Sequence, residues 1–195
     1  MSEITSEETI YAKKRFERYA AGLNVRVEHR HCKNGRFADN AFIQHCEEMG
    51  QGITYCGVNA HFQNGRAEKT IRDLQTMARK MILHAKGQWP ESIHLSLWPY
   101  ALRMVVRVHN NVPNSADASS RLEAFARIAV FPKSSHYHTF GCPAYMLTTE
   151  AEQGRAKKWE GRSVLGIYMG PSPHNAGSVS LVLNLTTGND RKSVV

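Results

Sequence analysis

Residues 61–69 have the sequence His61-Phe62-Gln63-Asn64-Gly65-Arg66-Ala67-Glu68-Lys69, a polar turn that leads into a predicted long helix. From position 67, apolar residues recur every three or four positions, at Ala67, Ile71, Leu74, Ala78, Met81 and Ala85. This spacing is typical of a helix that buries one stripe. Glu68 lies in the first turn, where the helix dipole stabilises a carboxylate by about 0.3 to 1 kcal/mol. Helix stability alone therefore explains its position, and a catalytic role would require further acidic partners.

The net charge of +8 is concentrated in the middle of the 195-residue chain. Residues 61–133 contain 11 Lys or Arg against 5 Asp or Glu, whereas residues 1–60 contain 8 of each. A positive field around one helical region favours a polyanionic partner such as nucleic acid, and a solvated basic face that improves solubility is the alternative. The aromatic residues of this region are expected mostly at core positions. They include Phe62, Trp89, Trp98 and Tyr100.

The sequence predicts an intracellular protein without a membrane partner. No apolar run approaches the roughly 20 residues of a membrane span, and the polar start Met1-Ser2-Glu3 lacks the apolar region of a signal peptide. In such a protein, irregularly spaced cysteines favour free thiols over a disulfide framework. The four cysteines are Cys32, Cys46, Cys56 and Cys142.

Helices and strands alternate in the first half of the chain. Thr5-Ser6-Glu7-Glu8 is typical of a capping box, and it precedes a predicted helix with one apolar face. That face consists of Ala12, Phe16, Tyr19 and Leu23. Period-two alternation predicts a strand over residues 25–31, a short helix fits residues 37–49, and a second strand fits residues 53–56. The order helix, strand, helix, strand, helix favours a parallel α/β layer.

The second half of the chain changes character after His136. Residues 91–112 fit an apolar helix that Pro99 starts afresh or kinks, and a linker with a short helix capped by Ser120 and Glu123 follows. Phe131-Pro132-Lys133 would close that helix. Residues 144–148, 163–169 and 179–185 then fit strands separated by Gly, Pro and charged turns. About sixty residues of this kind are small enough to form an all-β barrel.

Several motifs, in order, resemble the integrase core of copia-type LTR retrotransposons. They are Asn34-Gly35-Arg36-Phe37, the run 57–69, Ile71-Arg72, Trp89-Pro90-Glu91, the helix exit 110–113 and Phe140-Gly141-Cys142-Pro143. The resemblance implies an α/β fold in which residues 1–112 form an incomplete, N-terminally truncated ribonuclease H-like core. Residues 113–135 would be a linker, and residues 136–195 a small β-barrel of the retrotransposon polyprotein type. The family uses an Asp, Asp, Glu triad to bind two Mg²⁺ for 3′-end processing and DNA strand transfer.

Carried over to this sequence, the resemblance makes Glu68 the catalytic glutamate and leaves two of the three metal ligands missing. The second aspartate belongs at position 33, where this chain has Lys33. The first lies on an opening strand for which the 32 preceding residues leave no room. An ammonium repels a cation 4 Å away by roughly 4 kcal/mol per unit charge at an effective dielectric near 20. We therefore expect no paired metals and no catalysis. Asp39 is a conceivable substitute ligand, but it is predicted inside the following helix.

The function that the resemblance implies is therefore that of an inactive integrase fragment that still binds DNA. Gln63 and Asn64 would lie near a DNA end, and a basic face would hold phosphates. That face consists of Arg66, Lys69, Arg72, Arg79 and Lys80. Two alternatives stay open: an active Mg²⁺-dependent strand transferase, if other integrase subunits or a longer chain complete the site, and a decayed element with no selected role. The family implies a nuclear location.

The sequence also offers a possible zinc site, a possible cysteine nucleophile and an unpaired strand edge. A zinc site could be imagined from His29, His31, Cys32, His45, Cys46, Cys56 and His61, but no short Cys-x-x-Cys or His-x-x-x-His pair occurs, so ordinary core and surface roles are favoured. Cys142 could act as a nucleophile with His136 or His138, but its place before Pro143 favours a packed thiol. The strand at 25–31 would lack the partner that the intact family supplies, which predicts marginal solubility.

Overall fold

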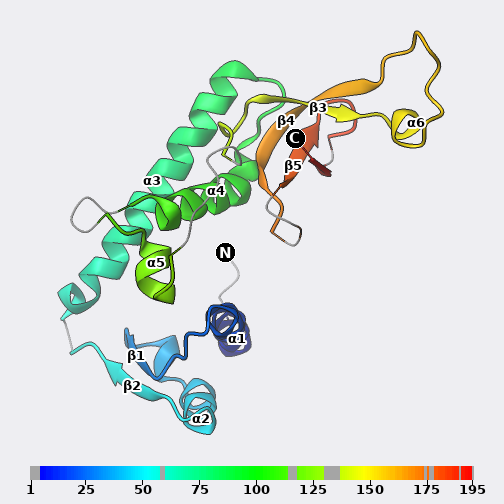
Figure 1. Cartoon of the computed structure of the whole chain (residues 1–195). Helices are drawn as coiled ribbons and strands as arrows, with labels where there is room; N and C mark the ends of the chain where they lie inside the picture. The colour runs from blue at the N-terminus through cyan, green and yellow to red at the C-terminus, as the bar shows by residue number, and fades with distance from the viewer. Residues whose placement is uncertain are drawn as a thin grey trace. The chain divides into compact units, whose positions relative to one another are not determined.

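Figure 1 shows the computed structural model of the chain, which describes residues 5–57, 60–113, 118–129, 137–173, 175, 178–188 and 190–194. The chain divides into two compact units. The first contains Met1–Ile71 and Leu122–Ala129, and the second contains Arg72–Arg121 and Val130–Val195. Because these are units of packing, the division into 1–112, 113–135 and 136–195 that the resemblance implies stays a prediction.

The first unit contains a small parallel α/β layer, as the alternation of elements predicted. The helix α1 (Ser6–Gly22) begins with the expected capping box, in which the Thr5 side chain accepts from the backbone N–H of Glu8. The strands β1 (His29–Cys32) and β2 (Gly52–Tyr55) pair in parallel. The helix α2 (Asn40–Glu48) lies between them in the sequence. Short 3₁₀ turns η1 (Arg36–Ala38) and η2 (His61–Asn64) connect these elements to their neighbours.

The strand β1 is shorter than the predicted strand at 25–31. In the parallel register, His29 lies opposite Gly52, where β2 begins. Residues 25–28 therefore have no ladder partner among the described strands, although they keep the alternation of half-buried and exposed positions. Glu28 still accepts at its carbonyl from the N–H of Gly52, but the strand predicted over 25–31 forms only from His29 onward.

The predicted apolar face of α1 is wrong. Phe16 and Tyr19 are 44% and 52% exposed, whereas Ala20 and Lys13 are buried. Lys13 is drawn inward because its ammonium lies 3.0 Å from the carboxylate of Glu17, which also accepts hydrogen bonds from Arg30 and Gln51. A polar network, and not an aromatic stripe, therefore decides which side of α1 is covered.

The second unit is built on two helices and an antiparallel sheet. The helix α3 (Gly65–Gln88) starts in the first unit and continues into the second, and α4 (Trp98–Asn111) follows the 3₁₀ turn η3 (Leu95–Leu97). Pro99 lies in the first turn of α4, so the helix starts there and not at position 91. One residue before it, Trp98 is 56% exposed, which corrects its predicted core position. The short helix α5 (Arg121–Ala126) lies where Ser120 predicted it, but its expected end at 131–133 falls outside the described residues.

The sheet contains β3 (Pro143–Leu147), β4 (Ser163–Pro171), β5 (Val179–Asn184) and β6 (Asp190–Val194), with the short helix α6 (Thr149–Glu152) after β3. The strands are antiparallel in the order β3-β4-β5-β6. Three of them were predicted, but the polar sequence of β6 concealed the fourth. Closure into a barrel stays a prediction.

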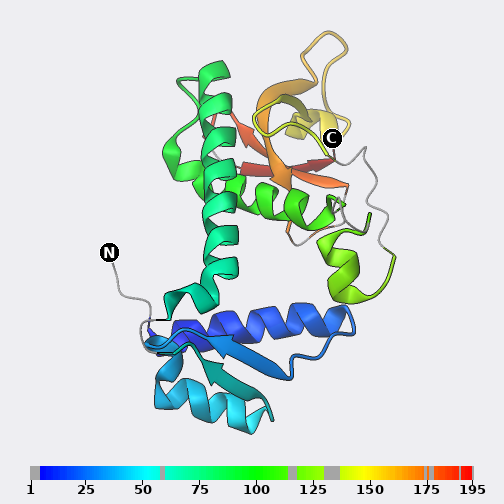
Figure 2. The same ribbon diagram turned by 90° about the vertical axis from the view of Figure 1, so that its left-hand side faces the viewer.

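A single hydrophobic core joins these helices to the sheet. The helix α4 packs against β4, and the buried side of α3 faces the same core, as Figure 2 shows. The buried members on the helices are Ala78, Ile82, Ala85, Ala101, Met104 and Val105. The stripe predicted on α3 is thus buried in its C-terminal half, whereas Ile71 is 55% exposed. No helix among the described residues has the length and apolar character needed to span a membrane.

Candidate functional site

The candidate site lies in the first unit, where β1 ends and α3 begins. Lys33 directly follows β1, and Glu68 lies in the first turn of α3. Although 35 positions separate them, the Lys33 Nζ donates to the Glu68 Oε1 over 3.1 Å. These are the two positions that the integrase resemblance assigns to the second aspartate and the catalytic glutamate.

Three hydrogen bonds connect the end of β1 with the end of β2 and with the turn before α3. Asn34 donates from Nδ2 to the carbonyl of Cys56 over 3.1 Å, which ties the end of β1 to the end of β2. The side-chain oxygen of Gln63 accepts from the backbone N–H of Gly57 over 2.8 Å. The backbone N–H of Ala60 donates to the carbonyl of Gly57. The motif residues Asn34 and Gln63 therefore shape the backbone that presents Lys33 and Glu68.

The ion pair is a surface interaction. The side chains of Lys33 and Glu68 are 49% and 42% exposed, and pairs of this kind contribute at most about 1 kcal/mol to stability. Its chemical effect is larger than its stability effect, because the ammonium neutralises the carboxylate and occupies the side of Glu68 where a cation would bind. The pair can hold a phosphate or other anion through Lys33, and the ammonium beside Glu68 disfavours a metal ion there.

The substitute ligand considered from the sequence, Asp39, has another role. It lies before α2 as the N-cap and not inside the helix, because one carboxylate oxygen accepts from the N–H of Ala41. A second hydrogen bond comes from the Ser6 hydroxyl, and this bond lowers the pKa of Asp39. In the described part of the chain, no three His, Cys, Asp or Glu side chains are grouped so as to hold a metal ion.

The five cations expected to bind DNA all lie on α3 and are exposed. They are Arg66, Lys69, Arg72, Arg79 and Lys80. With 100° per residue and a rise of 1.5 Å, they occupy an arc of about 140° along about 21 Å of helix. Glu68 lies at one border of this arc. One helix face therefore presents a continuous basic strip, which we call the α3 strip.

Local patterns did not predict the exposure of an aromatic residue that precedes this strip in the sequence. Phe62 was expected in the core, but it is 80% exposed on η2, immediately before Gln63. Gln63 is exposed and Asn64 is half-buried. Nothing in the local pattern separates an exposed Phe62 from a buried one, because the burial depends on the turn that places it.

The residues considered for a zinc site or a nucleophilic thiol lie in different surroundings. His29 Nε2 and His31 Nδ1 both lie about 3 Å from the Thr54 hydroxyl, at 2.9 Å and 3.0 Å, and the Cys56 Sγ is 3.5 Å from His31 Nε2. Cys32 and Cys46 instead pack with Phe42 in a hydrophobic cluster. Burial raises the pKa of Cys142, which opposes the thiolate form that a nucleophile requires. His136 lies outside the described residues.

Comparisons with known proteins leave the family open. No protein-family model matches the chain, and no curated protein matches it. Among solved structures, it is similar to a chain of the cryo-electron microscopy structure of the simian T-cell lymphotropic virus intasome in complex with PP2A regulatory subunit B56 gamma. The TM-score is 0.48 and the identity 14%, and the match covers 98% of this chain but only 63% of the other. A TM-score below 0.5 at this identity establishes neither a family nor a function.

Proposed function

We propose that this chain is a DNA-binding fragment of a copia-type LTR retrotransposon integrase that has lost strand-transfer activity. The observation that carries the proposal is the contact of 3.1 Å between Lys33 and Glu68. The motif resemblance assigns both positions, which lie 35 residues apart in the sequence, to one catalytic site. Their meeting supports the family assignment, and the identity of Lys33 supports the loss of activity.

The loss of activity follows from charge. A two-metal site clamps the attacking and leaving oxygens of a phosphoryl transfer, and several carboxylates must neutralise the paired ions. Here a single carboxylate, Glu68, is already paired with an ammonium. A divalent cation 4 Å from that ammonium would be repelled by about 8 kcal/mol at an effective dielectric near 20. Binding of two Mg²⁺ in this chain is therefore unfavourable.

Binding of DNA follows from the α3 strip. Five exposed cations along one helix can neutralise several phosphates and release the counterions condensed on them. The exposed ring of Phe62 lies in the turn that precedes this strip in the sequence, and an exposed aromatic face can stack on an unpaired base at a DNA end. Gln63 keeps its amide N–H groups available for the same end, since only its oxygen is used by Gly57.

The test measures binding of a labelled DNA duplex by fluorescence anisotropy at several salt concentrations. We expect log K against log salt to slope by about −0.9 per phosphate contacted, and the double variant Arg72→Glu/Arg79→Glu to reduce this slope by about 2 and the affinity at least about tenfold. The matched control is Arg15→Glu/Arg18→Glu on α1, which makes the same charge change at exposed positions outside the strip. Equal loss of affinity in both double variants would show that net charge alone, and not the α3 strip, binds DNA.

A second assay separates the fragment from an active enzyme. The chain is incubated with Mg²⁺ and a DNA substrate that carries a processed end, and joined products are resolved on a gel. We expect no product. A joined product that depends on Glu68 and disappears in Glu68→Gln would refute the loss of activity and favour the strand transferase.

A further inference from the structure

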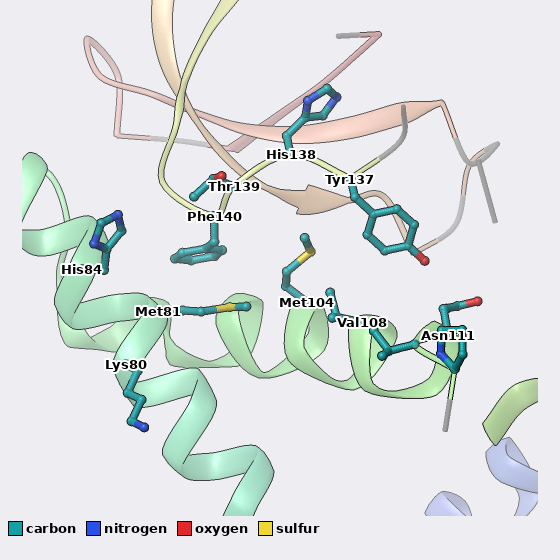
Figure 3. A pocket seen from close by; sticks show the side chains of 12 residues that line it. Lys80, Met81, His84, Met104, Val108, Asn111, Tyr137, His138, Thr139 and Phe140 are labelled. Carbon is teal, nitrogen blue, oxygen red and sulfur yellow. The ribbon is translucent and has the colours of Figure 1, made fainter. Parts of the chain in front are cut away.

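A cavity in the second unit lies between α3, α4 and residues 137–140, and it shares Lys80 with the α3 strip. Its volume is about 750 Å³, within the range of about 300 to 1,000 Å³ that small-molecule sites occupy. Its walls are apolar and come from three segments: Met81 on α3, Met104 and Val108 on α4, and Phe140. In Figure 3 the side chain of Met81 extends from α3 beneath the ring of Phe140.

The walls are part of the folded core and so are formed before any ligand binds. Met104 and Phe140 are 4% and 3% exposed and belong to the cluster that joins the helices to the sheet. Phe140 is followed by Gly141, whose N–H donates to the carbonyl of Tyr168 in β4, and this bond fixes the segment against the sheet. A preformed apolar site loses little conformational entropy when it binds a ligand.

One polar group in the cavity lacks a partner. The Tyr137 hydroxyl is buried and makes no hydrogen bond within the described part of the chain. The Arg107 guanidinium lies 5.5 Å from the centroid of the Tyr137 ring. Figure 3 shows the hydroxyl directed toward the side of the cavity formed by Asn111. An unpaired buried hydroxyl costs about 1 to 3 kcal/mol, which a ligand with an acceptor oxygen would recover.

The titratable groups around the cavity carry positive or no charge. Lys80 and His84 line it from α3 and His138 from the opposite wall, and the lining residues that the structure describes include no Asp or Glu. Lys80 lies at the rim, and in Figure 3 its ammonium is directed away from Phe140, so it contributes a field and not a fixed contact. A carboxylate or sulfonate is favoured in such surroundings, and a cation is not.

We propose that this cavity binds a small amphipathic anion, a molecule with a flat apolar body that fills the space between Met81, Met104 and Phe140 and an acidic oxygen that accepts from the Tyr137 hydroxyl. The ligand's apolar body replaces water against the side chains of the walls. Its anionic group supplies the missing hydrogen-bond partner, and no Asp or Glu among the described lining residues repels it. The proposal does not rest on the integrase assignment, although Lys80 belongs to both the cavity rim and the α3 strip.

The test uses a pair of probes that differ in one group: 1-anilinonaphthalene-8-sulfonate and its neutral parent N-phenyl-1-naphthylamine. The full chain is labelled with ¹³C at the methionine methyl groups and titrated with each probe. We expect the methyl signals of Met81 and Met104 to shift, whereas those of the exposed Met49 and Met77 stay in place. The sulfonate should bind about tenfold more tightly than the neutral probe, the effect of about 1.4 kcal/mol.

Two variants and a control decide the outcome. Tyr137→Phe keeps the ring and removes the hydroxyl, and it should weaken the sulfonate about fivefold while leaving the neutral probe unchanged. Val108→Phe places a ring in the cavity and should weaken both probes. Leu95→Ala, in a separate hollow lined by Trp98 and Leu102, should change neither. Equal affinity for the two probes in the wild type, or shifts of Met49 and Met77 as large as those of Met81 and Met104, would overturn the proposal.

Discussion

Glu68 and Glu17 are each paired with a lysine, but the two pairs differ in burial and therefore in how much they contribute to stability. The Lys33 and Glu68 side chains are nearly half exposed, so water screens their attraction. Glu17 is only 15% exposed and lies 3.0 Å from Lys13 and 2.6 Å from Arg30. Removal of one partner from a buried pair leaves a charge without compensation, which costs about 3 to 5 kcal/mol. The first pair therefore controls chemistry, and the second controls the stability of the first unit.

The pH dependence of stability is expected to report on Glu17. Burial alone would raise its pKa, but hydrogen bonds from Gln51, Arg30 and Lys13 outweigh burial and lower the pKa from 4.5 to about 2. Because the folded-state pKa is lowered, Glu17 stabilises the fold fully above pH 4.5, and this contribution of about 3 kcal/mol is lost as the pH falls toward 2.

Urea unfolding followed by circular dichroism checks this prediction. Glu17→Gln should lower the free energy of unfolding by about 3 kcal/mol at neutral pH, with the difference from wild type narrowing as the pH falls through the same window. The matched control is Glu47→Gln, an exposed position on α2. A constant difference between wild type and Glu17→Gln at every pH would contradict the pKa shift.

Substitution of Lys33 tests the charge argument at the ion pair. Lys33→Asp removes the ammonium and places a second carboxylate near Glu68, so the site should acquire weak affinity for Mn²⁺ or Mg²⁺, seen as a rise in melting temperature when the metal is added. The wild type and the neutral control Lys33→Asn should show no such rise. Under the proposed integrase function, Lys33→Asp still supplies only two of the family's three acidic ligands, so we expect no strand transfer. A metal response equal in Lys33→Asn would refute the argument.

At the scale of elements, the close contact of β4 with its neighbours depends on Gly166. A Cβ at this position would lie 2.5 Å from Val182 Cγ1, 2.7 Å from the carbonyl oxygen of Leu183 and 2.9 Å from Met146 Cε. The carbonyl belongs to the β5 ladder and cannot move without breaking its pairing. Glycine is therefore required for side chains of both neighbouring strands to close over β4.

Gly166→Ala should lower the free energy of unfolding of the second unit by about 2 kcal/mol or more, the range seen when a packed core is overfilled. The measurement is thermal unfolding with near-ultraviolet circular dichroism, which reports on the aromatic side chains of the core. Gly161→Ala is the matched control, since a Cβ there meets nothing within 4 Å. Similar melting temperatures for the two variants would show that β4 and β5 separate at little cost.

For the whole molecule, the open edge of β1 is the feature that most limits its behaviour in solution. Gly52 and Cys56 donate to the carbonyls of Glu28 and Cys32, so residues 28, 30 and 32 direct their backbone groups toward β2. Residues 27, 29 and 31 direct theirs to the opposite side, where no described strand pairs with them. Such an edge is a template for intermolecular strand pairing.

The chain is accordingly expected to associate as its concentration rises, unless a partner supplies a strand. Size-exclusion chromatography with light scattering at increasing concentration should show growing assemblies, and thermal melting of concentrated samples should be irreversible. A preparation that stays monomeric and melts cooperatively at high concentration without a partner would contradict this expectation.

Local sequence patterns were sufficient wherever a neighbour along the chain decides the structure. The capping box at Thr5, the three-and-four spacing after position 67 and the proline at the start of α4 each fix a helix through contacts within one or two turns. The contact between Lys33 and Glu68 joins positions 35 residues apart, and no local rule predicts it. The parallel pairing of β1 and β2 also followed from the alternation of elements.

Tertiary packing alone decided what depends on distant parts of the chain. The Glu17 network reversed the buried face of α1, the late start of β2 shortened β1, and Phe62 is exposed because of the turn that carries it. The unpaired Tyr137 hydroxyl is a property of a cavity that three separate segments enclose. Periodicity specifies which residues share a face, but burial is a relation between that face and whatever packs against it, which only the folded chain contains.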